Sequence, residues 1–163
     1  MAKLVLLLGS NLGSKKSNLQ SAIKELNTMV DKVVKQSKVY ATEAWGDTHQ
    51  EPFLNICLII ETTKTPEEVL RRTLMIEKKM GRVRTAKQYE PRIIDIDILY
   101  YDDLVMTTHQ LTIPHEQIAL RRFTLTPLAE ILPEFIHPVH QKTNLELWND
   151  CTDKLACTPL GTV

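Results

Sequence analysis

Runs of hydrophobic residues along the chain predict the strands of a sheet. Residues 4–8 are continuously aliphatic, which is typical of a central strand covered on both faces. Residues 33–40 and 53–61 are rich in β-branched and aromatic side chains, and each segment predicts a further strand. Residues 93–100, in which isoleucine alternates with aspartate, predict a fourth.

Apolar residues at helical spacing predict two longer helices. Those between residues 19 and 30 form one face, with Ser14 or Ser17 as the expected N-cap. A second helix is expected to begin after Thr65, because a proline and a capping-box glutamate follow this cap, and to end at Gly81.

Shorter helices are expected towards the C-terminus. The Thr126-Pro127 pair is the expected cap of a helix over residues 128–132, and residues 144–148 begin another. The order strand, helix, strand, strand, helix, strand predicts an α+β fold, a ferredoxin-like α/β sandwich with a mixed, mostly antiparallel sheet. With 43% hydrophobic residues, we expect residues 1–163 to form one domain.

Charge and cysteine content narrow the class of protein. Lys+Arg and Asp+Glu both number 20, so the chain lacks the overall positive field of a protein that binds nucleic acid through phosphates. No apolar stretch approaches the roughly 20 residues of a membrane helix. Three cysteines without a Cys-x-x-Cys pair fit a reduced compartment. We expect a cytoplasmic protein without a membrane, nucleic acid or obligate protein partner.

Two carboxylates in the fourth strand are the strongest candidate for chemistry. Residues i and i+2 of a strand point to one face about 6.5 to 7 Å apart, so Asp95 and Asp97 share one site while Ile94, Ile96 and Ile98 face the core. Paired carboxylates repel each other, and oxygen ligands of this kind suit Mg²⁺. The alternative is an exposed edge strand with ordinary alternation.

A basic segment stands close to the carboxylates. Residues 77–92 contain six Lys or Arg residues and two Glu residues in a chain that is otherwise balanced. Such a loop can contact a polyphosphate through charge-assisted hydrogen bonds, although a solvated loop would have the same composition. His115 and Arg121 stand in loop-like sequence, where they can bind a phosphate or stabilise charge on a leaving group.

Several motifs in order along the chain resemble one known family. They are Gly9-Ser10-Asn11-Leu12-Gly13, Tyr40-x-Thr42, Phe53-Leu54-Asn55, Glu77 ahead of Gly81-Arg82-Val83-Arg84, Pro91-Arg92-x-x-Asp95-Ile96-Asp97-Ile98, and Ile113-Pro114-His115 leading to Arg121-x-Phe123. Together they resemble the 6-hydroxymethyl-7,8-dihydropterin pyrophosphokinase family of folate biosynthesis. The resemblance implies a ferredoxin-like fold.

The resemblance also implies an activity and its catalytic residues. The β,γ-diphosphate of the co-substrate ATP would move to the pterin hydroxymethyl group, releasing AMP. Asp95 and Asp97 would bind two Mg²⁺ ions, and Asp97 would help to deprotonate the hydroxyl. Arg82 and Arg92 would neutralise the diphosphate.

The resemblance further implies two groups of binding residues. The ATP-binding residues would be Glu77, Arg84, Ile98, Thr112, His115 and Arg121. The pterin-binding residues would be Thr42, Phe53, Asn55 and Phe123. Aromatic faces suit a flat heterocycle, and an amide offers it both a donor and an acceptor. From its position alone, Phe53 would be a core aromatic and Asn55 a polar group at a strand end.

Some positions depart from the family pattern. Tyr89-Glu90 stands where Trp-Gly is frequent, and Gln110 and Glu116 stand where a basic residue and an aromatic one are often found near ATP.

Two other functions are compatible with the sequence. The first alternative is another magnesium-dependent phosphoryl or nucleotidyl transferase that uses the same aspartate pair. The second is a non-catalytic ferredoxin-like module that binds a small ligand.

Overall fold

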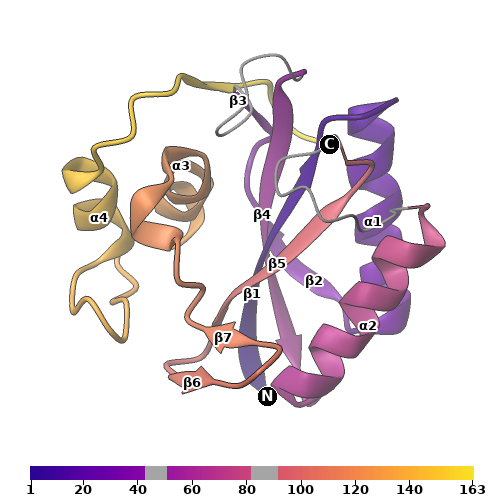
Figure 1. Cartoon of the computed structure of the whole chain (residues 1–163), viewed down its shortest axis with the longest axis horizontal. Coiled ribbons are helices and arrows are strands. Elements are labelled where there is room, and N and C mark those ends of the chain that lie inside the picture. Colours follow the sequence, from indigo (N-terminus) through magenta and orange to yellow (C-terminus); the bar gives the residue numbers. More distant parts are fainter. Residues whose placement is uncertain (43–50, 82–91) are drawn as a thin grey trace.

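A central antiparallel sheet forms the middle layer of the protein (Figure 1). The computed structural model describes residues 1–42, 51–81 and 92–163. Within these residues the sheet has six strands in the order β5-β1-β4-β3-β8, and β2 also pairs with β4. The strands are β1 Ala2–Ser10, β2 Val33–Gln36, β3 Tyr40–Thr42, β4 Phe53–Thr62, β5 Asp95–Tyr101 and β8 Cys157–Pro159.

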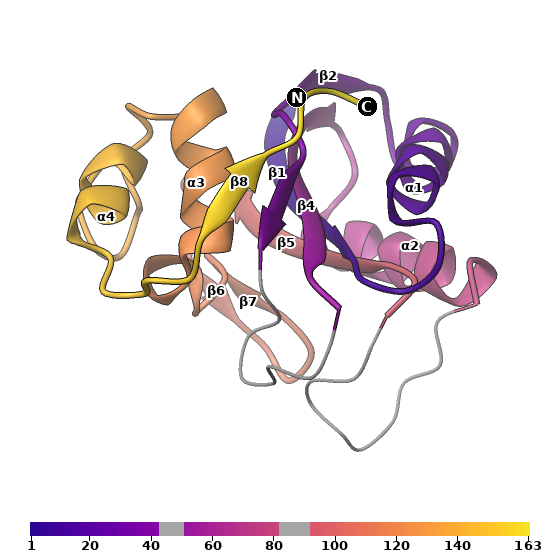
Figure 2. The same cartoon turned by 90° about the horizontal axis from the view of Figure 1, so that it is seen from above.

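Helices cover both faces of the sheet, as the two views in Figures 1 and 2 show. On one side lie α1 Lys15–Met29 and α2 Pro66–Lys79, and on the other α3 Arg122–Ile131 and α4 Asn144–Asp150. A small hairpin, β6 Met106–Thr107 and β7 Thr112–Ile113, and a 3₁₀ turn, η1 Ile118–Leu120, follow β5. The structure confirms the α+β sandwich, and every strand pairing in the described part of the chain is antiparallel.

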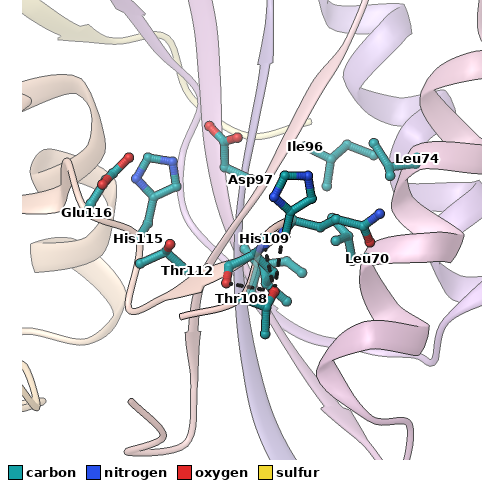
Figure 3. A pocket seen from close by; sticks show the side chains of 12 residues that line it. Leu70, Leu74, Ile96, Asp97, Thr108, His109, Thr112, His115 and Glu116 are labelled. Carbon is teal, nitrogen blue, oxygen red and sulfur yellow. Dashed lines mark hydrogen bonds between the residues drawn. The ribbon is translucent and has the colours of Figure 1, made fainter. Parts of the chain in front are cut away.

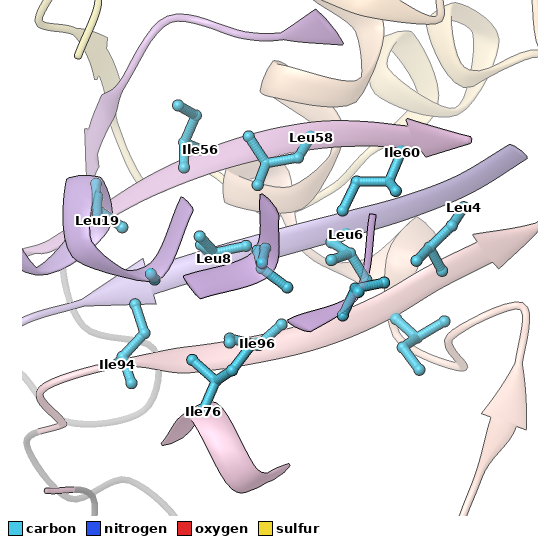
Figure 4. Packing of buried hydrophobic residues seen from close by; sticks show 14 of the residues in the cluster. Leu4, Leu6, Leu8, Leu19, Ile56, Leu58, Ile60, Ile76, Ile94 and Ile96 are labelled. Atoms are coloured by element: carbon cyan, nitrogen blue, oxygen red, sulfur yellow. The ribbon is translucent and has the colours of Figure 1, made fainter. Parts of the chain in front are cut away.

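Alternation along β1 builds two separate cores. Leu4, Leu6 and Leu8 point to the layer of α1 and α2, where they pack with isoleucines of β4 and β5 (Figure 4). Val5 and Leu7 point to the layer of α3 and α4. Because both faces of this strand are buried, its sequence is continuously aliphatic.

Most of the expected elements are present. The Thr65 side chain accepts a hydrogen bond from the Glu68 amide and begins α2, and Ser14 is the N-cap residue of α1. The segment 33–40, expected as one strand, divides into β2 and β3 around the buried Ser37. The Ser37 amide donates to the Cys57 carbonyl, and its hydroxyl accepts from the Cys57 amide, so strand pairing is interrupted there.

The expected start of α3 is wrong. The helix begins at Arg122, well before residue 128, and Pro127 lies inside it instead of at its first turn. The proline removes one backbone donor from the helix. The early start is stabilised by a residue that is distant in the sequence, because the Arg122 amide donates to the carboxylate of Asp153, 31 residues farther along, at 3.0 Å. No helix in the described ranges is long and apolar enough to cross a membrane.

Candidate active site

Strand β5 places two carboxylates at the edge of the sheet. Asp95 lies opposite Gly9 of β1 and Asp97 opposite Leu7, on the face that farther along is covered by α3 and α4. Both aspartates are partly exposed, whereas Ile96 and its isoleucine neighbours are buried on the other face. The alternation expected from the sequence is therefore present in the structure.

An arginine lies beside Asp95 at this edge of the sheet. Arg92 Nη1 lies 2.9 Å from Asp95 Oδ2. The Arg92 backbone is held at the end of β1, because its amide donates to Asn11 Oδ1 at 2.7 Å and its carbonyl accepts from the Asn11 amide at 3.0 Å. Asn11 is buried and also donates from Nδ2 to the carbonyl of Glu51. One asparagine thus joins three segments beside the carboxylates.

The surroundings of Asp97 favour its neutral form. Burial raises the pKa of this carboxyl well above its ordinary range, and the charge of Asp95 raises it further. Arg121 and Arg92 act in the opposite direction, and Glu77 adds to the increase. A cation between the two carboxylates would offset both the burial and the repulsion.

A small pocket of about 40 Å³ opens over the polar face of the sheet. It is lined by Leu7, Gly9, Phe53, Asn55, Arg92, Asp95, Asp97 and Phe123. Two aromatic side chains, from β4 and α3, therefore meet the carboxylate pair in one place. This arrangement suits a flat ring that carries a reactive group directed at the aspartates.

Two buried polar atoms in this region have no hydrogen-bond partner among the described residues: Asn55 Nδ2 and Thr42 Oγ1. Thr42 lies opposite Phe53 on the neighbouring strand β3. A buried donor without a partner costs roughly 1–3 kcal/mol, so such atoms mark places where a ligand can complete the hydrogen bonding. The donor and acceptor pattern of a polar heterocycle fits them.

Gly9 lines the small pocket. A Cβ atom at this position would lie 2.8 Å from Asn55 Oδ1 and 3.6 Å from Phe53 Cδ1. Because the first separation is far below van der Waals contact, only glycine allows the Asn55 amide to lie against β1.

A larger pocket of about 290 Å³ lies along the open edge of β5, between α2 and the β6–β7 hairpin. Figure 3 shows the Asp97 carboxylate and the His115 ring towards one end and Leu70, Leu74 and Ile96 towards α2. Ile98, Thr112, Gln110 and Glu116 also line it. Asp97 therefore lines both pockets.

A third hollow of about 520 Å³ continues from this pocket along α2. It shares Leu70, Leu74 and Leu111 with the larger pocket, and its walls are mainly apolar. A ligand with a polar end near Asp97 and a flat apolar end between these leucines would fit the combined space.

His115 is fixed in one orientation. Its backbone amide donates to the Leu99 carbonyl at 3.0 Å, and its Nδ1 accepts from the Gln117 amide at 3.2 Å. Burial, followed by the charge of Arg121, lowers the pKa of the imidazole. His115 is therefore neutral at neutral pH, with its proton on Nε2, where it can donate a hydrogen bond to an anion.

The remaining expected residues lie in different places. Glu77 is 2% exposed and is absent from the linings of all three pockets, because its carboxylate accepts from the Ile96 amide at 2.8 Å and supports β5 from behind. The Arg121 guanidinium lies 5.4 Å from the centre of the Phe123 ring. Arg82 and Arg84 fall outside the described residues, as do Tyr89 and Glu90.

A model of the family described as 7,8-dihydro-6-hydroxymethylpterin-pyrophosphokinase matches residues 5–133. The chain belongs to this family. The 2-amino-4-hydroxy-6-hydroxymethyldihydropteridine pyrophosphokinase of Aquifex aeolicus is 40% identical over 157 residues, which cover 96% of this chain and 97% of that protein. The enzyme of the same name from Methylorubrum extorquens is 42% identical over 137 residues, 83% of this chain and 86% of that protein.

Solved structures agree on the fold. The Plasmodium falciparum HPPK-DHPS wild type aligns with a TM-score of 0.75 at 17% identity, over 91% of this chain and 44% of that one. A complex of the same protein with pteroate aligns with a TM-score of 0.73 at 16% identity, over 91% of this chain and 44% of that chain. At this identity the similarity describes architecture. The pyrophosphokinase resemblance noted in the sequence is confirmed by the family match.

Two contributors to the pyrophosphokinase site were not assigned roles from the sequence. A glycine that interrupts the aliphatic run of β1 indicates a close approach, and this signal was available for Gly9. Asn11 gave no such signal, since its partners Arg92 and Glu51 lie 81 and 40 residues away along the chain.

Proposed function

We propose that this chain transfers the β,γ-diphosphate of ATP to the hydroxymethyl group of 6-hydroxymethyl-7,8-dihydropterin, giving AMP and the pterin diphosphate in folate biosynthesis. One observation above all supports this reaction: Asp97 lines both the small aromatic pocket and the larger pocket at the edge of β5. A flat acceptor in one pocket and a triphosphate in the other would meet at this carboxylate. Transfer between two bound substrates needs such a shared point.

The reaction is a displacement at the β-phosphorus. The pterin hydroxyl oxygen forms a bond to this phosphorus, and the bond from the phosphorus to the oxygen that bridges it to the α-phosphate breaks, so that AMP leaves. The hydroxyl proton must be accepted as the new bond forms. Asp97 is the proposed acceptor, because its carboxylate is the group common to both pockets.

The donor set fits Mg²⁺. Two carboxylates lie on one face of β5, and no group of three or more His, Cys, Asp or Glu residues in the described ranges is arranged to hold a metal ion. Such a site leaves coordination positions for water and phosphate oxygens, as Mg²⁺ prefers. We propose two Mg²⁺ ions held by Asp95 and Asp97, which when bound would supply charge stabilisation to the transferred group.

The triphosphate would be held by cationic and hydrogen-bonding side chains. Arg92 stands at the carboxylate edge, and neutral His115 offers its Nε2 proton to the larger pocket. Arg121 is near enough to lower the pKa of Asp97 by its charge. The resemblance adds Arg82 and Arg84 as further phosphate contacts. Charge-assisted contacts of this kind stabilise charge that develops in transfer.

The nucleoside would lie along the edge of β5. Ile98 and Thr112 line the pocket, and the apolar hollow between Leu70 and Leu111 continues from it. Glu77 would act on this side indirectly, by fixing the Ile96 amide.

The pterin would lie between Phe53 and Phe123, over Gly9. Asn55 Nδ2, which has no partner in the described part of the chain, and the region of Thr42 would complete hydrogen bonds to its edge. The three cysteines form no disulfide bond in the structure, which supports a cytoplasmic location. We also propose that the whole chain forms one domain.

Separate binding measurements test this division of the site. With an ATP analogue whose α,β-bridge cannot be cleaved, calorimetry should show tighter binding with Mg²⁺ than with EDTA. His115→Ala should weaken analogue binding about tenfold, the factor that 1.4 kcal/mol represents, and leave pterin binding unchanged. Phe123→Ala should weaken pterin binding and leave analogue binding unchanged. His140→Ala, which changes a histidine outside all three pockets, is the control.

Two results would contradict the assignment of one substrate to each pocket or of Mg²⁺ to the site. If His115→Ala and Phe123→Ala weakened the same ligand, the two pockets would not hold different substrates. Affinity for the analogue that did not depend on Mg²⁺ would remove the metal from the proposal.

A further inference from the structure

The first turn of α3 is held by residues at the end of α4 and just after it. The Arg121 side chain does not cap this helix, and the amide of Arg122 would otherwise be one of its unpaired N-terminal donors. Asp153 Oδ2 accepts from this amide at 3.0 Å, from 31 residues farther along the chain. A carboxylate at this place satisfies the donor and also interacts favourably with the helix dipole.

The Arg122 side chain binds the same segment. Its Nε donates to the Asp153 carbonyl at 2.8 Å, and its Nη2 donates to the Cys151 carbonyl at 3.0 Å and to the Trp148 carbonyl at 3.4 Å. The guanidinium also lies 5.1 Å from the centre of the Trp148 ring. One arginine thus binds three backbone carbonyls and an aromatic face, an arrangement that a lysine cannot reproduce.

Two more hydrogen bonds extend this contact. Trp148 Nε1 donates to Thr126 Oγ1 at 3.0 Å, one turn farther into α3. The second oxygen of Asp153 accepts from the Leu155 amide at 3.0 Å. We call Trp148, Cys151 and Asp153, together with Arg122, the α3 clamp. All of its members are described residues, and all but Arg122 lie beyond the part of the chain that the family model matches, which ends at residue 133.

The clamp holds the part of α3 that reaches the active site. Arg121 and Phe123 directly flank Arg122, and Phe123 lines the small pocket. Adjacent helical residues point about 100° apart, so the Arg122 side chain can bind the other clamp residues while Phe123 points to the sheet. The ends of helices fray, and contacts in the first turn therefore decide how firmly the Phe123 side chain is placed.

We infer that Arg122 and Asp153 are positioning residues for the pterin pocket, acting through Phe123. This inference rests on the proposed function, because it assumes that Phe123 contacts the pterin. Without the clamp the first turn of α3 loosens, and the aromatic wall of the pocket is no longer fixed before the substrate arrives. The substrate must then supply the ordering, and its affinity falls.

Steady-state kinetics with both substrates test the inference. Arg122→Met keeps much of the side-chain length but removes every side-chain donor, and Asp153→Ala removes the acceptor that caps the backbone amide of residue 122. Each should raise the KM for the pterin about fivefold to tenfold while the KM for ATP stays within about twofold. Asp153→Asn keeps an acceptor oxygen and should restore values near those of the unsubstituted protein.

Coupling between the two residues gives a second readout. Because both act on the same turn, the double variant Arg122→Met with Asp153→Ala should be no worse for the pterin than the weaker-binding single variant. Lys142→Ala is the matched control, since it breaks the exposed ion pair between Lys142, just before α4, and Asp150 of α4 at 2.9 Å without changing a clamp residue. Circular dichroism sets the assay temperature below the onset of unfolding for every variant.

The possible failures are distinguishable. If Arg122→Met does not fold, Arg122→Lys, which keeps the charge but not the fork of donors, should show an intermediate KM for the pterin. An unchanged pterin KM in folded clamp variants, together with a raised one in Phe123→Ala, would overturn the inference and leave the proposed function in place. Absence of AMP and pterin diphosphate with the unsubstituted protein would overturn the proposed function itself.

Discussion

The two faces of strand β5 differ in what they need from outside the chain. On one face, Ile96 and Ile98, together with Ile94 just before the strand, are buried among the apolar side chains of β1, α1 and α2. On the other, Asp95 and Asp97 stand beside an arginine and line open pockets. The apolar face is complete once the chain has folded. The acidic face is costly in the isolated protein and becomes favourable only with cations and substrates.

This contrast separates stability from activity along a single strand. Substitutions on the apolar face should act on the free energy of unfolding, and substitutions on the acidic face should act on turnover. The polar atoms of Asn55 and Thr42 that lack a hydrogen-bond partner within the described ranges lie on the acidic side of the same division.

Asp97→Asn should abolish most of the activity. Turnover should fall about a thousandfold, equivalent to about 4 kcal/mol in the barrier, because a metal ligand and the proposed proton acceptor are lost together. The melting temperature should stay the same or rise, since the repulsion from Asp95 disappears. Asp103→Asn, at an exposed position just after β5, is the control. Activity within a few-fold of normal would remove Asp97 from the mechanism.

Ile94→Ala should give the opposite pattern. Ile94 is fully buried, and truncation of such a side chain lowers the free energy of unfolding by about 2–5 kcal/mol. Chemical denaturation measures this loss, and Ile94→Val should cost only about 1 kcal/mol. At a temperature where the variant is folded, its turnover should remain close to normal. A large loss of turnover without a loss of stability would show that the two faces are not separate.

Acid should destabilise the protein through His137, which packs against Tyr100 of β5 with 5.6 Å between ring centroids. Its Nδ1 accepts from the amides of Val139 and His140, and burial, followed by the neighbouring His140, lowers its pKa to about 4. The unfolded state therefore binds a proton first, and stability should fall as the pH decreases from about 6.5 towards 4.

The size of the His137 effect is about 2 kcal/mol, and urea denaturation at pH 7.5 and pH 5 measures it. His137→Asn keeps an acceptor for the turn but does not titrate, so its stability should change less between these two pH values. An equal loss of stability in both proteins would assign the acid sensitivity to other groups.

Gly9→Ala should have the smallest effect and the most selective one. The new methyl group displaces the Asn55 amide, which a Cβ would approach to 2.8 Å. The KM for the pterin should rise about tenfold, or about 1.4 kcal/mol, and the KM for ATP should not change. Initial rates with each substrate varied in turn measure both constants. Equal changes in both would mean that Gly9 acts on the fold and not on the pocket.

The sequence predicts one face of this comparison better than the other. The alternation in residues 93–100 and the capping signals at Thr65 are local, and the structure confirms the strand and the helix they predict. The start of α3 depends on Asp153, which lies 31 residues away, so the nearest proline at position 127 gave the wrong boundary. Local patterns cannot show a cap that comes from another segment.

The candidate site follows the same rule. Spacing alone placed Asp95 and Asp97 on one face, whereas their convergence with Phe53, Asn55 and Phe123 required the fold or the family resemblance. Asn11 illustrates the limit, because its role appears only when Arg92 and Glu51 are brought to the end of β1.

The proposed reaction can be tested by identifying its products. The protein is mixed with ATP, Mg²⁺ and 6-hydroxymethyl-7,8-dihydropterin, and the nucleotides and pterins are separated and identified. We predict AMP and the pterin diphosphate in equal amounts, with no product when Mg²⁺ is removed. Formation of ADP, or absence of turnover while both substrates bind, would contradict the account.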